Sequence, residues 1–175
     1  MQVNGWELFA HSLLLDQLEK LMAAVEKAKA KAKAKAKKPD DYRSTANFKL
    51  LAALNELIFV TIPADPTRPE YRQGNTLGDD YKHWFRAKFG GQRFRLFFRY
   101  DSKAKVIVYA WVNDEDSKRT YGSKTDAYAV FKKMLDKGNP PDDWNALLKA
   151  TKDPAAVGRL EKARPPPAEE DPQSE

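Results

Sequence analysis

The chain has 175 residues, of which 42% are hydrophobic and 32% are charged, and its formal net charge is +6. This size predicts one folded domain with polar extensions, and the basic balance favours a polyanionic partner. The absence of cysteine excludes a disulfide framework, a zinc-thiolate site and a cysteine nucleophile, and we expect neither a metal nor another cofactor.

The N-terminal part predicts a short strand and two paired helices. Residues 3–10 alternate loosely, as a strand does, and Ser12 is the expected N-cap of an amphipathic helix. Residues 28–38 alternate alanine and lysine, which gives a helix no apolar stripe, so we expect this extension to lie in solvent. An arm that binds RNA or the ribosome is the alternative interpretation. Residues 48–59 predict a second helix, antiparallel to the first.

Three prolines at 63, 66 and 69 predict an irregular connection that reaches residue 80. A β-hairpin follows at residues 84–100, with Gly90 and Gly91 as its expected two-residue turn. A third strand at 105–112 should extend the sheet, with Phe98 opposite Ile107 and Phe94 opposite Trp111.

The two faces of the predicted hairpin differ in chemistry. A two-residue turn places Lys88 opposite Arg93 and Arg86 opposite Arg95. Like charges in these positions destabilise a hairpin, so we expect the face to bind an anion, with RNA phosphate as the candidate. The apolar face holds Phe85, Ala87, Phe89, Phe94, Leu96, Phe98 and Tyr100, and the basic face holds Trp84, Arg86, Lys88, Arg93, Arg95, Phe97 and Arg99.

The C-terminal part predicts one helix that begins near Ser123 and Asp126 and ends at Gly138, then a short helix up to residue 152. Residues 153–175 are rich in proline and end acidic, so we expect a disordered tail after a domain of residues 1–152. The N-terminus lacks a signal-peptide pattern and no apolar run reaches the length of a membrane span, so we expect a cytoplasmic protein without membrane contact.

Several uncommon strings occur in one order along the chain: VNGW at 3–6, KFG at 88–90, RLFFRY at 95–100, WVNDE at 111–115, RTYG at 119–122 and KTDAY at 124–128. In these strings the chain resembles the RelE/ParE superfamily of bacterial toxins, and within it the YhaV type. The resemblance implies an α+β, RelE-like (microbial ribonuclease-like) fold, in which an N-terminal helical hairpin and C-terminal helices pack on an antiparallel sheet. It also implies an mRNA-cleaving toxin of a type II toxin-antitoxin system, with the ribosome as a candidate place of action and a PrlF-type (AbrB-like) antitoxin as partner.

The resemblance also implies catalytic residues. In RelE-like nucleases a basic pair lies on one strand, one arginine on the next strand, and a second arginine and a tyrosine follow later. By this resemblance the pair corresponds to Arg86 and Lys88, and the next arginine to Arg95. The later arginine corresponds to Arg119, and the tyrosine to Tyr128 or Tyr121.

The residues themselves indicate how RNA could be bound and cut. Trp84 and Phe97 are candidates for stacking on a base, Arg93 and Arg99 for guiding the RNA backbone, and His83 for a further RNA contact. Cleavage needs no metal if the 2′-hydroxyl of RNA attacks the adjacent phosphate and cationic groups stabilise the transition state. Candidate proton carriers are Lys88, Asp114, Glu115, Tyr121 and Tyr128.

Three alternatives remain open from the sequence. The first is a gyrase inhibitor of the ParE type, which does not need the basic cluster. The second is a noncatalytic RNA-binding module that modulates translation. The third is a toxin that has lost its activity.

Overall fold

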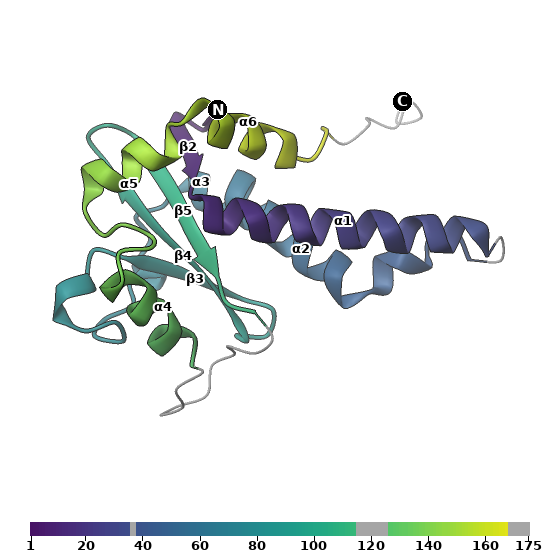
Figure 1. The fold of residues 1–175 in the computed structure, drawn as a ribbon, viewed down its shortest axis with the longest axis horizontal. Helices are drawn as coiled ribbons and strands as arrows, with labels where there is room; N and C mark the ends of the chain where they lie inside the picture. Colours follow the sequence, from purple (N-terminus) through teal and green to yellow (C-terminus); the bar gives the residue numbers. More distant parts are fainter. Residues whose placement is uncertain (36–37, 115–125, 168–175) are drawn as a thin grey trace.

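A five-stranded sheet with helices on both of its faces forms the centre of the molecule (Figure 1). The computed structural model describes residues 1–35, 38–114 and 126–167. The strands follow the order β1-β2-β5-β4-β3 across the sheet. Their bounds are β1 Gln2–Val3, β2 Trp6–Ala10, β3 Phe85–Phe89, β4 Phe94–Asp101 and β5 Val106–Val112.

The sheet is mixed, which corrects the expected antiparallel sheet. Strand β2 runs parallel to β5, whereas the other three neighbouring pairs are antiparallel. Strand β5 lies between β2 and β4, and all seven of its residues are buried. Burial on both faces explains why the sequence of β5 is continuously apolar instead of alternating.

The helices form two groups. Helices α1, α2 and α6 lie on one face of the sheet, and α4 and α5 lie on the other (Figure 1). The bounds of the longer helices are α1 Ser12–Ala34, α2 Ala46–Glu56, α4 Ala127–Asp136, α5 Trp144–Thr151 and α6 Pro154–Ala163. The short segments are η1 Asp41–Ser44, the π-helical η2 Leu57–Thr61, α3 Ile62–Ala64, η3 Pro69–Tyr71 and η4 Asp79–Tyr81.

The start of α1 differs from the prediction in its capping residue. His11, and not Ser12, is the N-cap, because the His11 Nδ1 atom accepts a hydrogen bond from the Leu13 backbone N–H at 3.2 Å. Burial lowers the pKa of His11, against a smaller raising effect of Asp16. The neutral ring is the form that can accept this bond.

The predicted apolar face of the hairpin is confirmed. Ala87, Phe94, Leu96 and Phe98 are buried in the core between the sheet and α1, α2 and α6. The opposite face carries a second hydrophobic core, in which Phe97 packs against α4. The predicted basic face is therefore covered over part of its length instead of lying open to solvent.

The strand register differs from the predicted one in two places. Four residues, 90–93, connect β3 to β4, so Lys88 pairs with Arg95 and Arg86 pairs with Phe97. This shift of two residues leaves every side chain on its predicted face, because the side chains of a strand alternate. A bulge at Phe97 and Phe98 then places Trp111 in the second core, away from the face shared with Phe94.

One of the two chain extensions is more ordered than the sequence predicts. The alanine-lysine run extends the first helix up to Ala34, as expected, although Ala32 is buried in the part of the chain where α1 contacts η1 and α2. In the segment expected to be a disordered tail, α6 packs on α1, and Arg159 pairs with Asp16 and Glu19. The apolar residues of α6 at spacings of three and four explain this packing.

Residues 46–64 form one helix that is long and apolar enough to cross a membrane by length and composition, contrary to the expectation that no such segment exists. Its buried residues Leu54, Ile58 and Ile62 recur every four positions and lie in the core against the sheet. Packing in the protein interior accounts for these three residues, whereas 28% of the segment as a whole is buried.

Candidate functional site

Two buried arginines meet at one tyrosine hydroxyl. Arg86 on β3 donates from Nε to the Tyr128 hydroxyl at 2.8 Å, and Arg95 on β4 donates from Nε to the same oxygen at 3.0 Å. The exposed fractions are 8% for Arg86, 4% for Arg95 and 3% for Tyr128. The Arg95 guanidinium also lies 5.4 Å from the centre of the Tyr128 ring. We call Arg86, Arg95 and Tyr128 the arginine-tyrosine cluster.

Strand pairing and helix capping fix the three side chains of this cluster. Arg86 and Arg95 are diagonal neighbours on one sheet face, because Lys88 is the direct partner of Arg95. Tyr128 lies in the first turn of α4, where Asp126 caps the helix by accepting a hydrogen bond from the Tyr128 backbone N–H at 3.0 Å. The helix N-cap thus sets where the hydroxyl meets the two strands.

Backbone carbonyl groups hold the outer ends of both guanidinium groups. Arg86 Nη1 donates to the carbonyl of Glu70 at 2.7 Å, and Arg95 Nη1 donates to the carbonyl of Gln92 at 2.7 Å. Asn113, just beyond β5, accepts from the Arg95 backbone N–H at 2.5 Å and donates to the carbonyl of Arg93 at 3.0 Å. The long connection, the hairpin turn and the end of β5 therefore all orient this cluster.

The cluster concentrates positive charge in a buried position. Within the described parts of the chain, no carboxylate lies within 4.0 Å of the Arg86 or Arg95 guanidinium. Two unit charges roughly 6 Å apart repel by about 3 kcal/mol at an effective dielectric constant of about 20. A bound anion would offset this repulsion, and the planar guanidinium fork is suited to phosphate oxygens.

Lys88 lies on the rim of the cluster. Its side chain is exposed and is the direct cross-strand neighbour of Arg95. Arg86, Lys88 and Arg95 thus share one sheet face, as the alternation predicts, although the pairs across the hairpin differ from the predicted ones. The face offers two buried cations and one exposed cation to an incoming anion.

The two aromatic residues predicted to stack on RNA bases are in the core instead. Both Trp84 and Phe97 have an exposed fraction of 0%. The Phe97 ring stacks on the Phe131 ring at a centroid distance of 4.2 Å, and the Trp84 ring meets the Phe131 ring edge-on. Helix α4 covers both rings, so the prediction that they stack on bases is wrong, and their role is to pack α4 against the sheet.

The remaining predicted RNA contacts lie outside the arginine-tyrosine cluster. The Arg99 guanidinium lies 5.4 Å from the centre of the Trp84 ring and 5.0 Å from the centre of the Trp144 ring. It also donates a hydrogen bond to the carbonyl of Asp142. Burial lowers the pKa of Arg99, with a raising effect of Asp142. His83 Nε2 lies 2.6 Å from Asp142 Oδ1. Both side chains connect the hairpin region to the segment before α5, and the RNA contacts of Arg99 and His83 stay predictions.

Arg93 is exposed in the hairpin turn, where its Nε donates to the carbonyl of Gly90 at 3.0 Å. Among the candidate proton carriers, Asp114 is exposed just beyond β5. The predicted catalytic residues Arg119 and Tyr121, and the candidate base Glu115, lie outside the described residues.

Sequence reasoning missed the supporting residues Glu70, Gln92 and Asn113. Two of them act through backbone carbonyl groups, which carry no sequence signal. The position of Asn113 directly after a buried strand is the sequence feature that could have indicated its supporting role. In residues 1–35, 38–114 and 126–167, no group of three or more His, Asp or Glu side chains could hold a metal ion.

Comparison with known proteins gives one family. The family described as toxins with endonuclease activity, of toxin-antitoxin systems, matches residues 8–152. The chain is similar to the ribonuclease toxin YhaV of Escherichia coli strain K12, with 46% identity over 153 residues, which cover 87% of this chain and 96% of the relative. The toxin YhaV of Escherichia coli O157:H7 shows the same identity and coverage. No solved structure gives a significant match.

Proposed function

Because the chain belongs to the YhaV family of toxins with endonuclease activity, we propose that the arginine-tyrosine cluster is the centre at which it cleaves RNA. The protein is an endoribonuclease toxin of a toxin-antitoxin system, and a cognate antitoxin is its partner. The proposed substrate is mRNA in the cytoplasm, free or on the ribosome. The proposed antitoxin is of the PrlF type, and the proposed fold is RelE-like.

The observation that carries this proposal is the pair of buried arginines without a carboxylate partner among the described residues. Arg86 and Arg95 would bind one phosphate and stabilise the negative charge that grows on it in the transition state. Since Tyr128 accepts from both Nε atoms, it acts as a positioning residue that holds the two guanidinium groups side by side. Preorganised donors of this kind need no rearrangement during the reaction.

The proposed reaction is a metal-independent transesterification. The 2′-oxygen of the RNA attacks the adjacent phosphorus, the bond to the 5′-oxygen breaks, and the products carry a 2′,3′-cyclic phosphate and a 5′-hydroxyl. The 2′-hydroxyl loses a proton and the leaving 5′-oxygen gains one. Lys88, exposed beside Arg95, is the proposed side chain for one of these proton transfers. Arg119 and Tyr121 are proposed to complete the site, by resemblance alone.

The test is incubation of the purified full chain with mRNA, with and without ribosomes and with and without EDTA, followed by mapping of the new ends. We expect discrete cuts with 5′-hydroxyl ends that persist in EDTA. Arg86→Gln and Arg95→Gln should each lower the cleavage rate by about 10² to 10³-fold. Arg164→Gln removes one exposed charge at the end of α6 and should cleave like the wild type.

Four results would each contradict a part of the proposal. Loss of cleavage in EDTA, with recovery on addition of Mg²⁺, would contradict the metal-independent reaction. Full activity of both glutamine variants would contradict the role of the arginine pair. RNA binding without any cleavage by the wild type would indicate a noncatalytic module, and gyrase-dependent DNA breaks would indicate a ParE-type activity.

A further inference from the structure

The second half of α1 forms an arm that extends beyond the sheet together with η1 and the start of α2 (Figure 1). Val25 and Ala32 are the buried residues of this half, and α1 contacts both η1 and α2. Lys27, Lys31 and Lys35 recur every fourth residue and are exposed. They therefore form a single row along the outside of the arm, about 6 Å apart at a rise of 1.5 Å per residue.

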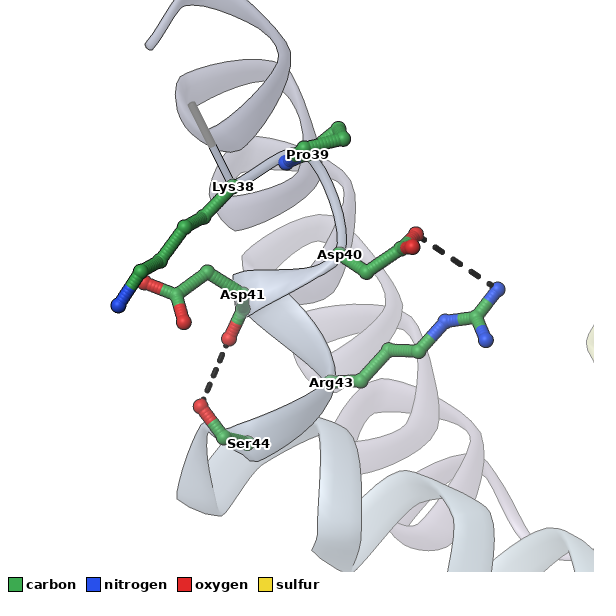
Figure 2. Close-up of a pocket in the computed structure, with 6 residues that line it drawn as sticks. All are labelled: Lys38, Pro39, Asp40, Asp41, Arg43 and Ser44. Atoms are coloured by element: carbon green, nitrogen blue, oxygen red, sulfur yellow. Dashed lines mark hydrogen bonds and ion pairs between the residues drawn. The ribbon is translucent and has the colours of Figure 1, made fainter. Parts of the chain in front are cut away.

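The charges of this lysine row are not neutralised. In the described parts of the chain, no carboxylate lies within 4.0 Å of Lys27, Lys31 or Lys35. At the tip of the arm the pattern is different, because Arg43 is turned toward Asp40 at 4.0 Å (Figure 2). Lysines four residues apart destabilise a helix by a few tenths of a kcal/mol per pair, and a bound polyanion removes this cost.

The hairpin turn, residues 90–93, borders both α2 and the arginine-tyrosine cluster. A cavity of about 440 Å³ lies between the first half of α2 and this turn, and it is lined by Lys49 and Arg93 among other residues. The same turn includes Gln92, whose carbonyl accepts from Arg95 Nη1. Exposed positive side chains are therefore present beside the cluster at Lys88, on the turn at Arg93 and on α2 at Lys49, in addition to the lysine row on α1.

We propose that this lysine row binds the backbone of the RNA strand that the toxin cuts, beyond the nucleotides held at the arginine-tyrosine cluster. The inference rests on the proposed function and adds a second contact region for the same substrate. Exposed lysines are point charges that neutralise phosphates without reading bases. The row therefore raises affinity for long RNA without changing which bond is cut.

The test compares two triple variants that remove the same charge. Lys27→Ala/Lys31→Ala/Lys35→Ala removes the row, and alanine favours the helix, so this variant should fold. The matched control is Lys133→Ala/Lys137→Ala/Lys149→Ala, which removes three exposed lysines from α4, its C-terminus and α5. Binding is measured over a range of salt concentrations with 2′-O-methyl RNA of 30 and of four nucleotides, which lacks the attacking hydroxyl.

For the 30-nucleotide RNA, loss of the row should weaken binding about tenfold and reduce the slope of log K against log salt by about 2, since each single-strand phosphate contact contributes about 0.7. Binding of the four-nucleotide RNA and the pattern of cuts in ordinary mRNA should not change. An equal effect of the control variant or an unchanged slope would overturn the inference. Wild-type protein that does not cut ordinary mRNA at all would instead contradict the proposed function.

Discussion

The Tyr128 hydroxyl is the atom on which the two arginines of the proposed centre converge, so Tyr128→Phe tests how much the cluster depends on it. The substitution keeps the ring that packs against Phe97 and removes the hydroxyl that accepts two hydrogen bonds, at 2.8 and 3.0 Å. Both donors are charged and buried. Hydrogen bonds to charged groups contribute about 1.5 to 3 kcal/mol each. Because the two bonds share one acceptor, we expect a loss of about 2 to 3 kcal/mol in the free energy of unfolding.

The effect on cleavage follows from the same geometry. Without the shared acceptor the two guanidinium groups are free to separate, so the preorganised charge at the phosphate is lost. We expect kcat to fall about 100-fold with little change in KM, as for the loss of one transition-state contact. The assay is urea unfolding together with single-turnover cleavage of a labelled mRNA.

Tyr81→Phe is the matched control for this experiment. It also removes one tyrosine hydroxyl, which donates to Asp136 Oδ1 at 2.6 Å on the surface, outside the cluster. We expect a stability loss below about 1 kcal/mol and wild-type cleavage. Tyr128→Phe protein that unfolds at a lower urea concentration but cleaves at the wild-type rate would refute the positioning role and leave Tyr128 with a structural role alone.

Two further variants test other parts of the structure. His11→Asn keeps an N-cap acceptor but removes the titrating ring. Because burial lowers the folded-state pKa of His11 below the unfolded value of about 6.5, the free energy of unfolding of the wild type should fall as the pH falls below 6.5. Urea unfolding should show that the variant loses less stability than the wild type between pH 8 and pH 5. An equal loss of stability in both proteins would contradict the conclusion that His11 titrates with a lowered pKa in the folded state. Phe97→Leu should cost about 1 to 2 kcal/mol of stability and leave RNA affinity unchanged, because the ring is fully buried against Phe131. A large loss of RNA affinity at unchanged stability would restore the base-stacking role.

Periodicity carries most of what can be read about this fold in one dimension. Alternation at 85–100 correctly separates the apolar set of Ala87, Phe94, Leu96 and Phe98 from the basic set of Arg86, Lys88 and Arg95. The three- and four-residue spacing of apolar residues likewise predicts α1 and α2. These patterns depend only on the geometry of one strand or one helix, which is why they survive a register error of two residues.

The sequence by itself determined the composition of each face of the hairpin and, through the resemblance, the family. Only the tertiary structure decided that β2 pairs in parallel with β5, that α4 buries Trp84 and Phe97, and that Tyr128 closes on Arg86 and Arg95 from more than 30 residues away. These features arise from contacts between distant segments, where side-chain shape and hydrogen-bond geometry select one arrangement among several that local patterns allow. The local pattern therefore shows which charged residues share one face of the hairpin, and the packing of α4 shows which of them are held together at Tyr128.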